Sequence, residues 1–185
     1  MKLRKGQFGF TIVEMLVVIF IMGILSTVVI ANFKQGVKQK EILLTSDGVV
    51  QLIRLAQSYS LGGKQVSNRP TSYFQFKTSR NTKVAYVEAK LSGIATPVTV
   101  ETYNFPKAVK IRNEIYGISV SCSTSCTTNP TTVYIKFVPP FGRMEVSSDG
   151  STWSSFNYVD IQIQHDTGFV KTIHIDGLSG KIGVQ

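Results

Sequence analysis

The chain has 185 residues, of which 20 are Lys or Arg and 11 are Asp or Glu, so its formal net charge is +9. It holds one long apolar run and no second one, and internal repeats are absent, which leaves room for one membrane segment and one folded domain of ordinary size. The basic residues are scattered singly, and this favours a solvated surface over a nucleic-acid-binding one.

The N-terminal part consists of a basic leader and an apolar span. We predict a leader peptide at residues 1–9 and a transmembrane helix at 10–33, because the uncharged stretch after Glu14 would cover roughly 28 Å as a helix, close to the thickness of a bilayer's hydrocarbon core. Glu14 is the only ionisable side chain between Lys5 and Lys34. A carboxylate in a span is costly unless it is paired or protonated, so we expect Glu14 to be functional. No Lys or Arg within the span supplies its partner.

The helix is expected to continue as an amphipathic segment at residues 34–63. Apolar residues recur there at spacings that suit one helical face: Val37, Ile42, Leu44, Val49, Leu52, Ile53, Ala56 and Tyr59. Gly62 and Gly63 are predicted to end the helix. Gly36 and Gly48 lie inside it, where glycine costs up to about 1 kcal/mol relative to alanine, so both are candidate points of bending or local melting.

Residues 64–185 are predicted to form a β-rich globular domain, because short alternating segments rich in β-branched and aromatic residues are separated by turn-forming ones. We expect strands at 72–77, 83–91, 98–105, 109–112, 115–121, 133–138, 143–146, 156–164, 169–175 and 181–184. Turns are expected at 149–150, 165–168 and 176–180. The predicted fold class is α+β, with one long N-terminal helix packed by its second half on an antiparallel β-sheet domain.

The segment "GFTIVEM" resembles the prepilin-type N-terminus shared by type IV pilins and type II secretion pseudopilins. The leader "MKLRKGQFG", the junction of Gly9 and Phe10, Thr11, two aliphatic residues and Glu14 carry this resemblance. More loosely, "QLIRLAQSYSLGGK", "IKFVPPFGRMEV" and the closing "SGKIGV" are similar to the minor pseudopilin H and minor pilin group. The chain departs from many members at Ala31, where they carry a proline.

The resemblance implies that a prepilin peptidase cuts between Gly9 and Phe10 and N-methylates the new Phe10 amine. Glu14, one helical turn along, would neutralise that amine or the amine of a neighbouring subunit. The implied protein is a structural subunit of a pilus or pseudopilus and not an enzyme, with no cofactor. Its implied partners are the peptidase, other pilin or pseudopilin subunits, an inner-membrane assembly platform and the membrane.

We expect the N-terminus to lie in the cytoplasm and the large domain outside the inner membrane, because a nine-residue tail cannot form a domain and the two cysteines favour an oxidising compartment. Two alternatives remain. A signal peptidase could cut after Ala31 and release a secreted binding domain that begins at Asn32, or the chain could stay an uncleaved membrane tether. The length of the apolar run and the presence of Glu14 inside it argue against a signal peptide.

Cys122 and Cys126 flank three residues, and we expect a disulfide between them, with free thiols as the alternative. A zinc site is disfavoured because His165 and His174 do not follow a zinc-finger pattern. Neither histidine has a nucleophile motif nearby, so no catalytic residue is expected. Turn formation rather than calcium binding is expected of three aspartates: Asp149, Asp160 and Asp166.

Four aromatic residues are expected to pack in the core from alternate strand positions, with a binding surface as the alternative: Tyr134, Phe141, Trp153 and Tyr158. A DNA-binding role would place basic residues beside them. Lys136 and Arg143 are near them in the sequence, but the pattern is weak, so DNA is a partner without support.

Overall fold

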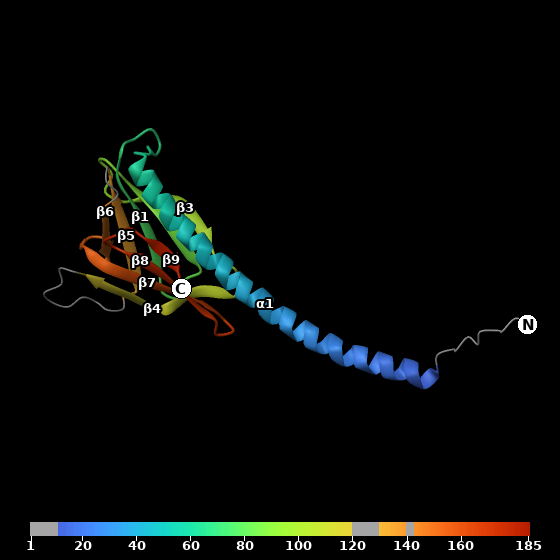
Figure 1. Ribbon diagram of the computed structural model, residues 1–185. Helices are drawn as coiled ribbons and strands as arrows, with labels where there is room; N and C mark the ends of the chain where they lie inside the picture. Colours follow the sequence, from blue (N-terminus) through green and yellow to red (C-terminus); the bar gives the residue numbers. More distant parts are fainter. Residues whose placement is uncertain (1–10, 120–129, 140–142) are drawn as a thin grey trace, which may run out of the picture. The chain divides into compact units, whose positions relative to one another are not determined.

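The computed structural model describes residues 11–119, 130–139 and 143–185. Its contacts divide the chain into two compact units, one that ends at Lys38 and one formed by residues 39–185. Helix α1 (Ile12–Leu61) begins in the first unit and ends in the second, and the strands that the structure describes all follow it in the second unit (Figure 1). The predicted α+β fold class, with one long N-terminal helix and antiparallel sheets, is therefore confirmed.

The strands form two sheets, and every neighbouring pair is antiparallel. In chain order the strands are β1 (Thr71–Ser79), β2 (Val84–Leu91), β3 (Val98–Asn104), β4 (Val109–Ser119), β5 (Thr132–Val138), β6 (Arg143–Ser147), β7 (Phe156–His165), β8 (Val170–Asp176) and β9 (Ile182–Val184). The first sheet has the order β3-β2-β1-β5-β6, and the second has the order β4-β7-β8-β9. Short loops join most strands that are neighbours in a sheet, as expected from the predicted turns.

Strand β4 joins two segments that the sequence predicted as separate strands, 109–112 and 115–121. Its register against β7 shifts between Ile111 and Ile115. The two polar residues that separate the predicted strands, Asn113 and Glu114, therefore lie in an irregularity of one continuous strand. A bulge of this kind adds residues to one strand without ending the pairing. The expectation of two strands here was therefore wrong, and its last two residues lie outside the described part of the chain.

The core of the second unit forms between α1 and both sheets. Alternate residues are buried in β5 and in most of β7, where they include Val159, Ile161 and Ile163, whereas β3 has no buried residue. The largest fully buried side chains include four phenylalanines, one each from β5 and β7 and two from β1: Phe74, Phe76, Phe137 and Phe156. Helix α1 contributes Val49, Ile53 and Ala56, which have no exposed surface. The hydrophobic effect of burying these side chains holds the C-terminal part of α1 on the sheets.

The apolar stripe of α1 differs from the prediction at two positions. Leu44 is 57% exposed and Val37 is 52% exposed, whereas Thr45 and Ser46 are buried. The hydroxyls of these two residues donate to the carbonyl oxygens of Glu41 and Ile42, each at 2.8 Å, so their burial leaves neither hydroxyl unpaired. Leu44 follows Ile42 by two residues, which turns it about 200° around the helix and away from the core.

Gly48 is a packing residue and not a point of melting. A Cβ at this position would lie 2.3 Å from the hydroxyl oxygen of Tyr103 on β3, so only glycine admits that ring against the helix. Helix α1 is continuous through Gly48 and through Gly36, where a Cβ would meet nothing within 4 Å. Close packing therefore explains Gly48, and the helix does not melt there.

The C-terminus of α1 lies where the two glycines predicted it. The N–H of Lys64 donates to the carbonyl of Tyr59 at 3.1 Å, and the N–H of Gly63 donates to that of Ser60 at 3.4 Å. Gly63 has a φ of 59°, a left-handed conformation that glycine adopts without strain. These bonds form a Schellman motif, which satisfies the last carbonyl groups of the helix.

Candidate functional site

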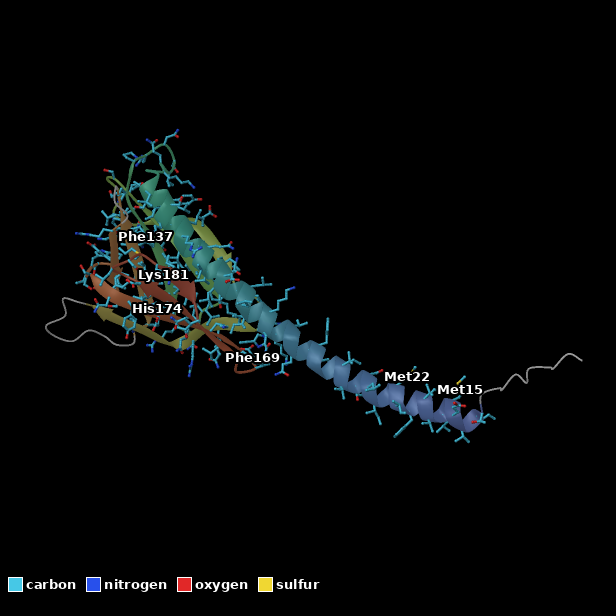
Figure 2. All side chains as sticks on the ribbon, viewed as in Figure 1. Met15, Met22, Phe137, Phe169, His174 and Lys181 are labelled. Atoms are coloured by element: carbon cyan, nitrogen blue, oxygen red, sulfur yellow. The ribbon has the colours of Figure 1, made fainter. Side chains whose placement is uncertain are left out.

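The part of α1 from Ile12 to Ile30 exposes mostly apolar side chains. From Ile12 to Phe33 the large hydrophobic residues are all exposed, with Ile12 at 87% and Phe33 at 74%. Figure 2 shows side chains projecting outward from this part of α1, among them Met15 and Met22. Among the described residues, α1 is the one helix long and apolar enough to cross a membrane. A helix that is apolar on all sides needs lipid or other protein around it.

Three polar side chains interrupt the apolar surface between Ile12 and Ile30: Glu14, Ser26 and Thr27. The hydroxyl of Ser26 donates to the carbonyl of Met22, and that of Thr27 to the carbonyl of Ile24, both at 2.7 Å. Both hydroxyls are thus satisfied within the helix and tolerate an apolar environment. The carboxylate of Glu14 has no partner among the residues that the structure describes.

Thr11 caps the N-terminus of α1. Its hydroxyl oxygen accepts the backbone N–H of Glu14 at 3.2 Å, and its carbonyl accepts the N–H of Met15 at 3.2 Å. A Thr at the cap and a Glu three residues later are the signature of a capping box. The structure shows the Thr11 half of this motif. The sequence analysis missed this cap, although the spacing of the two residues was sufficient to predict it. A carboxylate in the first turn also interacts favourably with the positive end of the helix dipole.

Several predicted site residues lie outside the described part of the chain. They are the cleavage-site pair Gly9 and Phe10, the disulfide pair Cys122 and Cys126, and Phe141. The predicted cleavage, N-methylation and disulfide therefore stay predictions. Glu14, the residue predicted to act in assembly, is the third residue of α1, and its side chain is exposed.

Three of the aromatic residues expected in the core are only half-buried: Tyr134, Trp153 and Tyr158. Trp153 packs edge-on against Tyr73 with ring centroids 5.9 Å apart, and the Lys136 ammonium lies 4.5 Å from the Trp153 ring. Lys136 also forms an ion pair with Glu145, as does Arg143. The structure thus places Lys136 beside Trp153, and Glu145 compensates the charges of both Lys136 and Arg143, which does not favour a phosphate-binding surface.

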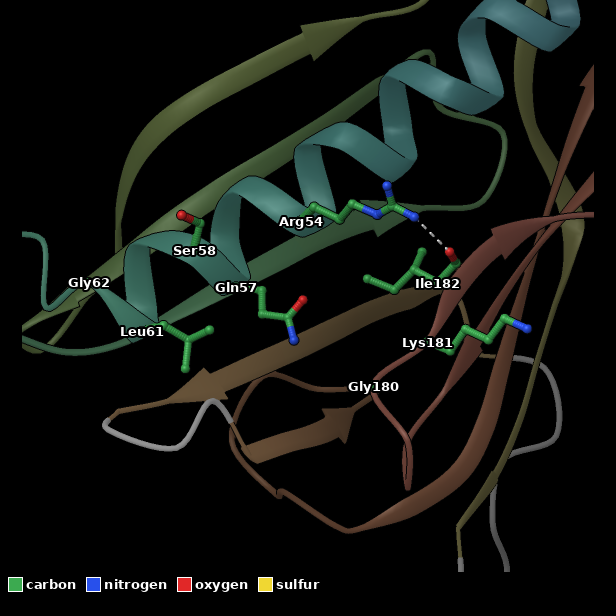
Figure 3. Close-up of a pocket in the computed structure, with 8 residues that line it drawn as sticks. All are labelled: Arg54, Gln57, Ser58, Leu61, Gly62, Gly180, Lys181 and Ile182. Atoms are coloured by element: carbon green, nitrogen blue, oxygen red, sulfur yellow. Dashed lines mark hydrogen bonds between the residues drawn. The ribbon is translucent and has the colours of Figure 1, made fainter.

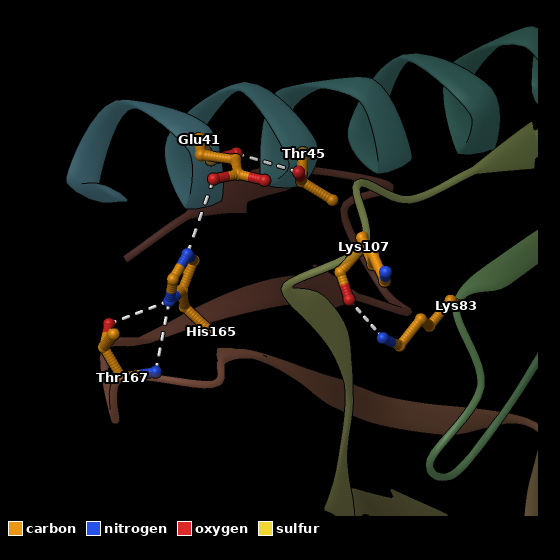
Figure 4. Close-up of polar contacts among 6 residues, drawn as sticks. All are labelled: Glu41, Thr45, Lys83, Lys107, His165 and Thr167. Carbon is orange, nitrogen blue, oxygen red and sulfur yellow. Dashed lines mark hydrogen bonds and ion pairs between the residues drawn. The ribbon is translucent and has the colours of Figure 1, made fainter. Parts of the chain in front are cut away.

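The two histidines have different surroundings. His174 on β8 is half-exposed, as expected for a solvated strand face, and its Nδ1 lies 2.6 Å from a carboxylate oxygen of Asp160. His165 is 3% exposed, and its Nε2 lies 3.4 Å from a carboxylate oxygen of Glu41 on α1 (Figure 4). The backbone N–H of Thr167 donates to Nδ1 of His165 at 3.1 Å. No sequence pattern indicated this contact, because its two partners are far apart in the chain.

Asp149 lies in the bend after β6 and Asp166 in the turn after β7, as expected, but Asp160 lies within strand β7, so the expectation of a turn role was wrong for Asp160. Asp149 accepts the backbone N–H groups of Thr152 and Ser151, each at 2.8 Å, and these bonds, with that from the Ser147 hydroxyl, hold the pKa of its carboxyl well below the usual range. In the described part of the chain, no group of three or more His, Cys, Asp or Glu side chains is arranged to hold a metal ion. Asp160 pairs with His174, and Asp166 is exposed in the turn after β7.

An open cleft of about 760 Å³ lies between the last turns of α1 and the segment 180–182 (Figure 3). Arg54 lines it and donates from Nη2 to the carbonyl of Ile182 at 3.1 Å. Lys181 and Leu61 also line it, and no acidic residue does. Both Arg54 and Lys181 are exposed, so the cleft presents two positive charges to solvent.

Residues 4–30 match the family model described as the prokaryotic N-terminal methylation motif. The match covers the basic leader, the junction of Gly9 and Phe10, and Glu14, and it supports the resemblance to pilin-type proteins at the N-terminus. No curated protein and no solved structure matches the chain. The family match thus concerns the N-terminus, and statements about the β-rich part rest on the structure.

Proposed function

We propose that this chain is a structural subunit, a minor pilin or pseudopilin, of a type IV pilus or type II secretion pseudopilus. It is made as a precursor, cut between Gly9 and Phe10 by a prepilin peptidase, and N-methylated at Phe10. The observation that carries the proposal is the exposed apolar surface of α1, in which the carboxylate of Glu14 is the one polar side chain without a partner among the described residues. The methylation motif at residues 4–30 supports it.

Cleavage supplies the missing partner. It turns Phe10 into a terminal ammonium at the start of a helix, where the positive end of the dipole disfavours another positive charge. Glu14 neutralises this charge, either in its own chain or in a neighbouring subunit. In a filament core of low dielectric, such a pair is strong and costly to break, so it fixes the axial register while the apolar surfaces supply the cohesion.

The remaining parts of the proposal follow from this arrangement. The subunit waits in the inner membrane with its N-terminus in the cytoplasm and its β-rich domain outside, and an assembly platform transfers it to the filament. It is a substrate of the peptidase and has no enzymatic activity of its own. Similarity of three further segments to the minor pseudopilin H and minor pilin group supports a minor rather than a major subunit.

N-terminal sequencing of the mature protein tests the processing step. The expected first residue is N-methylated Phe10. Asn32 as first residue would identify a signal peptide, and an intact Met1 would identify a membrane tether, so either result would overturn the proposal.

Substitution at Glu14 tests the assembly step. Glu14→Gln keeps a side chain that can complete the capping box but removes the charge, whereas Glu14→Ala removes both. We expect processing of both variants to stay intact, and incorporation into filaments to fall by about tenfold for each, as loss of a charged contact implies. Normal incorporation of Glu14→Gln with loss in Glu14→Ala would assign Glu14 to capping alone and reject the pairing.

A further inference from the structure

The cleft between the last turns of α1 and the segment 180–182 is lined by hydrogen-bond donors and by no acid. Arg54 and Gln57 line it from the helix, and Lys181 lines it from the opposite side (Figure 3). A guanidinium and an ammonium donate hydrogen bonds and accept none. The cleft therefore offers donors and two positive charges, and no carboxylate among its lining residues neutralises them.

The backbone of β9 adds one more donor to the cleft. Thr172 and Gln185 exchange two backbone hydrogen bonds, at 3.2 and 2.8 Å, so Gln185 turns its N–H and C=O toward β8. Such pairs alternate along an antiparallel ladder, and Ile182, three residues earlier, therefore turns its backbone groups away from β8. Its carbonyl accordingly accepts Nη2 of Arg54 at 3.1 Å.

The N–H of Ile182 lies on the same side of the strand as this carbonyl and has no partner among the described residues. Ile182 is 5% exposed and lines the cleft, so an acceptor reaches this N–H from inside the cleft. A buried N–H without a partner is costly, and an acceptor placed beside it removes that cost.

We propose that this cleft binds an acidic side chain of an extended peptide segment that belongs to another protein. The carboxylate accepts the N–H of Ile182 and faces the remaining N–H groups of the Arg54 guanidinium, which its bond to the Ile182 carbonyl holds in place. Lys181 adds a second positive charge. The site goes beyond the proposed structural role, and binding to it does not depend on whether the chain enters a filament.

The size and lining of the cleft favour a peptide over other anions. Its volume of about 760 Å³ is that of a cleft for a larger ligand than a single carboxylate group. Leu61 lines it with 53% of its surface exposed and offers an apolar contact to a residue next to the acid. Ile182 lies on an edge strand, and extended chains pair with the outward backbone groups of such strands.

The charge of the chain favours a different protein as the partner. With a net charge of +9, this chain repels a second copy at long range and attracts an acidic protein. Two cations are few for a nucleic-acid strand, because its binding depends on a series of phosphate contacts.

Titration of a peptide into ¹⁵N-labelled full-length protein in detergent micelles tests the site. The probe is acetyl-GTETLG-amide, whose blocked ends leave the glutamate side chain as its one carboxylate. We expect a saturable downfield shift of the Ile182 amide proton, because this N–H gains an acceptor. The same peptide with glutamine in place of glutamate is expected to bind about tenfold more weakly. Equal binding of the two peptides, or no saturable shift at Ile182, would overturn the proposal.

Two variants remove the positive charges of the cleft one at a time. Arg54→Gln is expected to weaken binding of the glutamate peptide by about tenfold, and Lys181→Gln by about threefold. Lys181→Gln leaves the bond between Arg54 and Ile182 in place, so its effect does not come from a displaced β9. The matched controls Arg69→Gln and Lys40→Gln change exposed residues that do not line the cleft, and the affinity should stay unchanged. Cleft variants that bind as well as their controls would contradict the site.

Competition identifies the kind of anion. Sodium acetate supplies a carboxylate without a peptide chain, and a single-stranded decamer of deoxythymidine supplies phosphates. At the concentration of the bound peptide, neither is expected to reverse the shift of the Ile182 amide. Reversal by the decamer would assign the cleft to nucleic acid, and reversal by acetate would make it an unselective anion site, so either result would reject a peptide as the ligand.

Discussion

The Nε2 atom of His165 lies 3.4 Å from a carboxylate oxygen of Glu41, and this contact joins the end of β7 to α1. His165 is buried, and Thr167 donates its backbone N–H to Nδ1, so Nδ1 acts as an acceptor and the ring proton is on Nε2. Nε2 itself makes no hydrogen bond in the described structure, so it is a buried ring nitrogen faced by the carboxylate of Glu41 at an ion-pair distance.

Substitutions at Glu41 are expected to separate hydrogen bonding from charge. Glu41→Leu should lower the free energy of unfolding by about 0.5–1 kcal/mol, because it removes the carboxylate that faces the buried Nε2 at 3.4 Å. Glu41→Gln keeps an acceptor oxygen and should cost clearly less. Urea unfolding of the full-length protein in detergent, followed by the fluorescence of Trp153, measures both. Equal losses in the two variants would show that the charge of Glu41, rather than an acceptor oxygen, stabilises the contact.

Gly48→Ala is expected to destabilise the β-domain, because its Cβ would lie 2.3 Å from the Tyr103 hydroxyl and 2.4 Å from the ring carbon that bears it. Overpacking of this kind costs about 1–3 kcal/mol. Gly36→Ala is the matched control, since nothing lies within 4 Å of its Cβ and alanine favours a helix. Denaturant unfolding of both variants checks the difference. A loss in Gly36→Ala as large as that in Gly48→Ala would contradict packing as the reason for the glycine.

The sequence predicted most of the secondary structure because its signals are local. Alternation in β7 and β8 and the turn residues between them determine a hairpin without reference to the remaining chain, and Gly62 and Gly63 mark a helix end by their own conformational freedom. The polar pair inside β4 was taken for a break because a bulge and a loop have the same local composition. Only the pairing with β7 distinguishes them.

What the sequence could not predict depends on contacts between distant residues. Which face of α1 is buried was decided by the shape of the sheets, which accepted Thr45 and Ser46 and left Leu44 outside. Trp153 was expected in the core, but it covers the outer face of a sheet beside Lys136, where its large ring shields an ion pair. At the candidate site the helix cap could be predicted from the spacing of Thr11 and Glu14. The cleft beside Arg54 could not, because it depends on where β9 lies relative to α1.

The predicted bridge between Cys122 and Cys126 has a direct test. Intact-mass measurement of the unreduced protein should show a deficit of two hydrogens relative to the reduced form. Closing so short a loop is expected to contribute about 2 kcal/mol by restricting the unfolded chain. Cys122→Ser and Cys126→Ser should therefore lower stability equally, and unequal losses or an unchanged mass would contradict the bridge.

The ion pairs of Glu145 are expected to make the stability of the β-domain depend on pH. Burial opposes ionisation of Glu145, but the hydrogen bond and charge of Lys136, with those of Arg143, outweigh it and hold the pKa of this carboxyl below its ordinary 4.5. A lowered folded-state pKa means that the contribution is fully present above about pH 4.5 and is lost as the pH falls through the folded value. Glu145→Gln should lower the free energy of unfolding by about 1–2 kcal/mol at pH 7 and flatten its fall in acid. Urea unfolding between neutral and acid pH measures both, with Asp166→Asn, in the exposed turn after β7, as the control. Parallel pH profiles for Glu145→Gln and the unchanged protein would assign the acid sensitivity to other carboxyls.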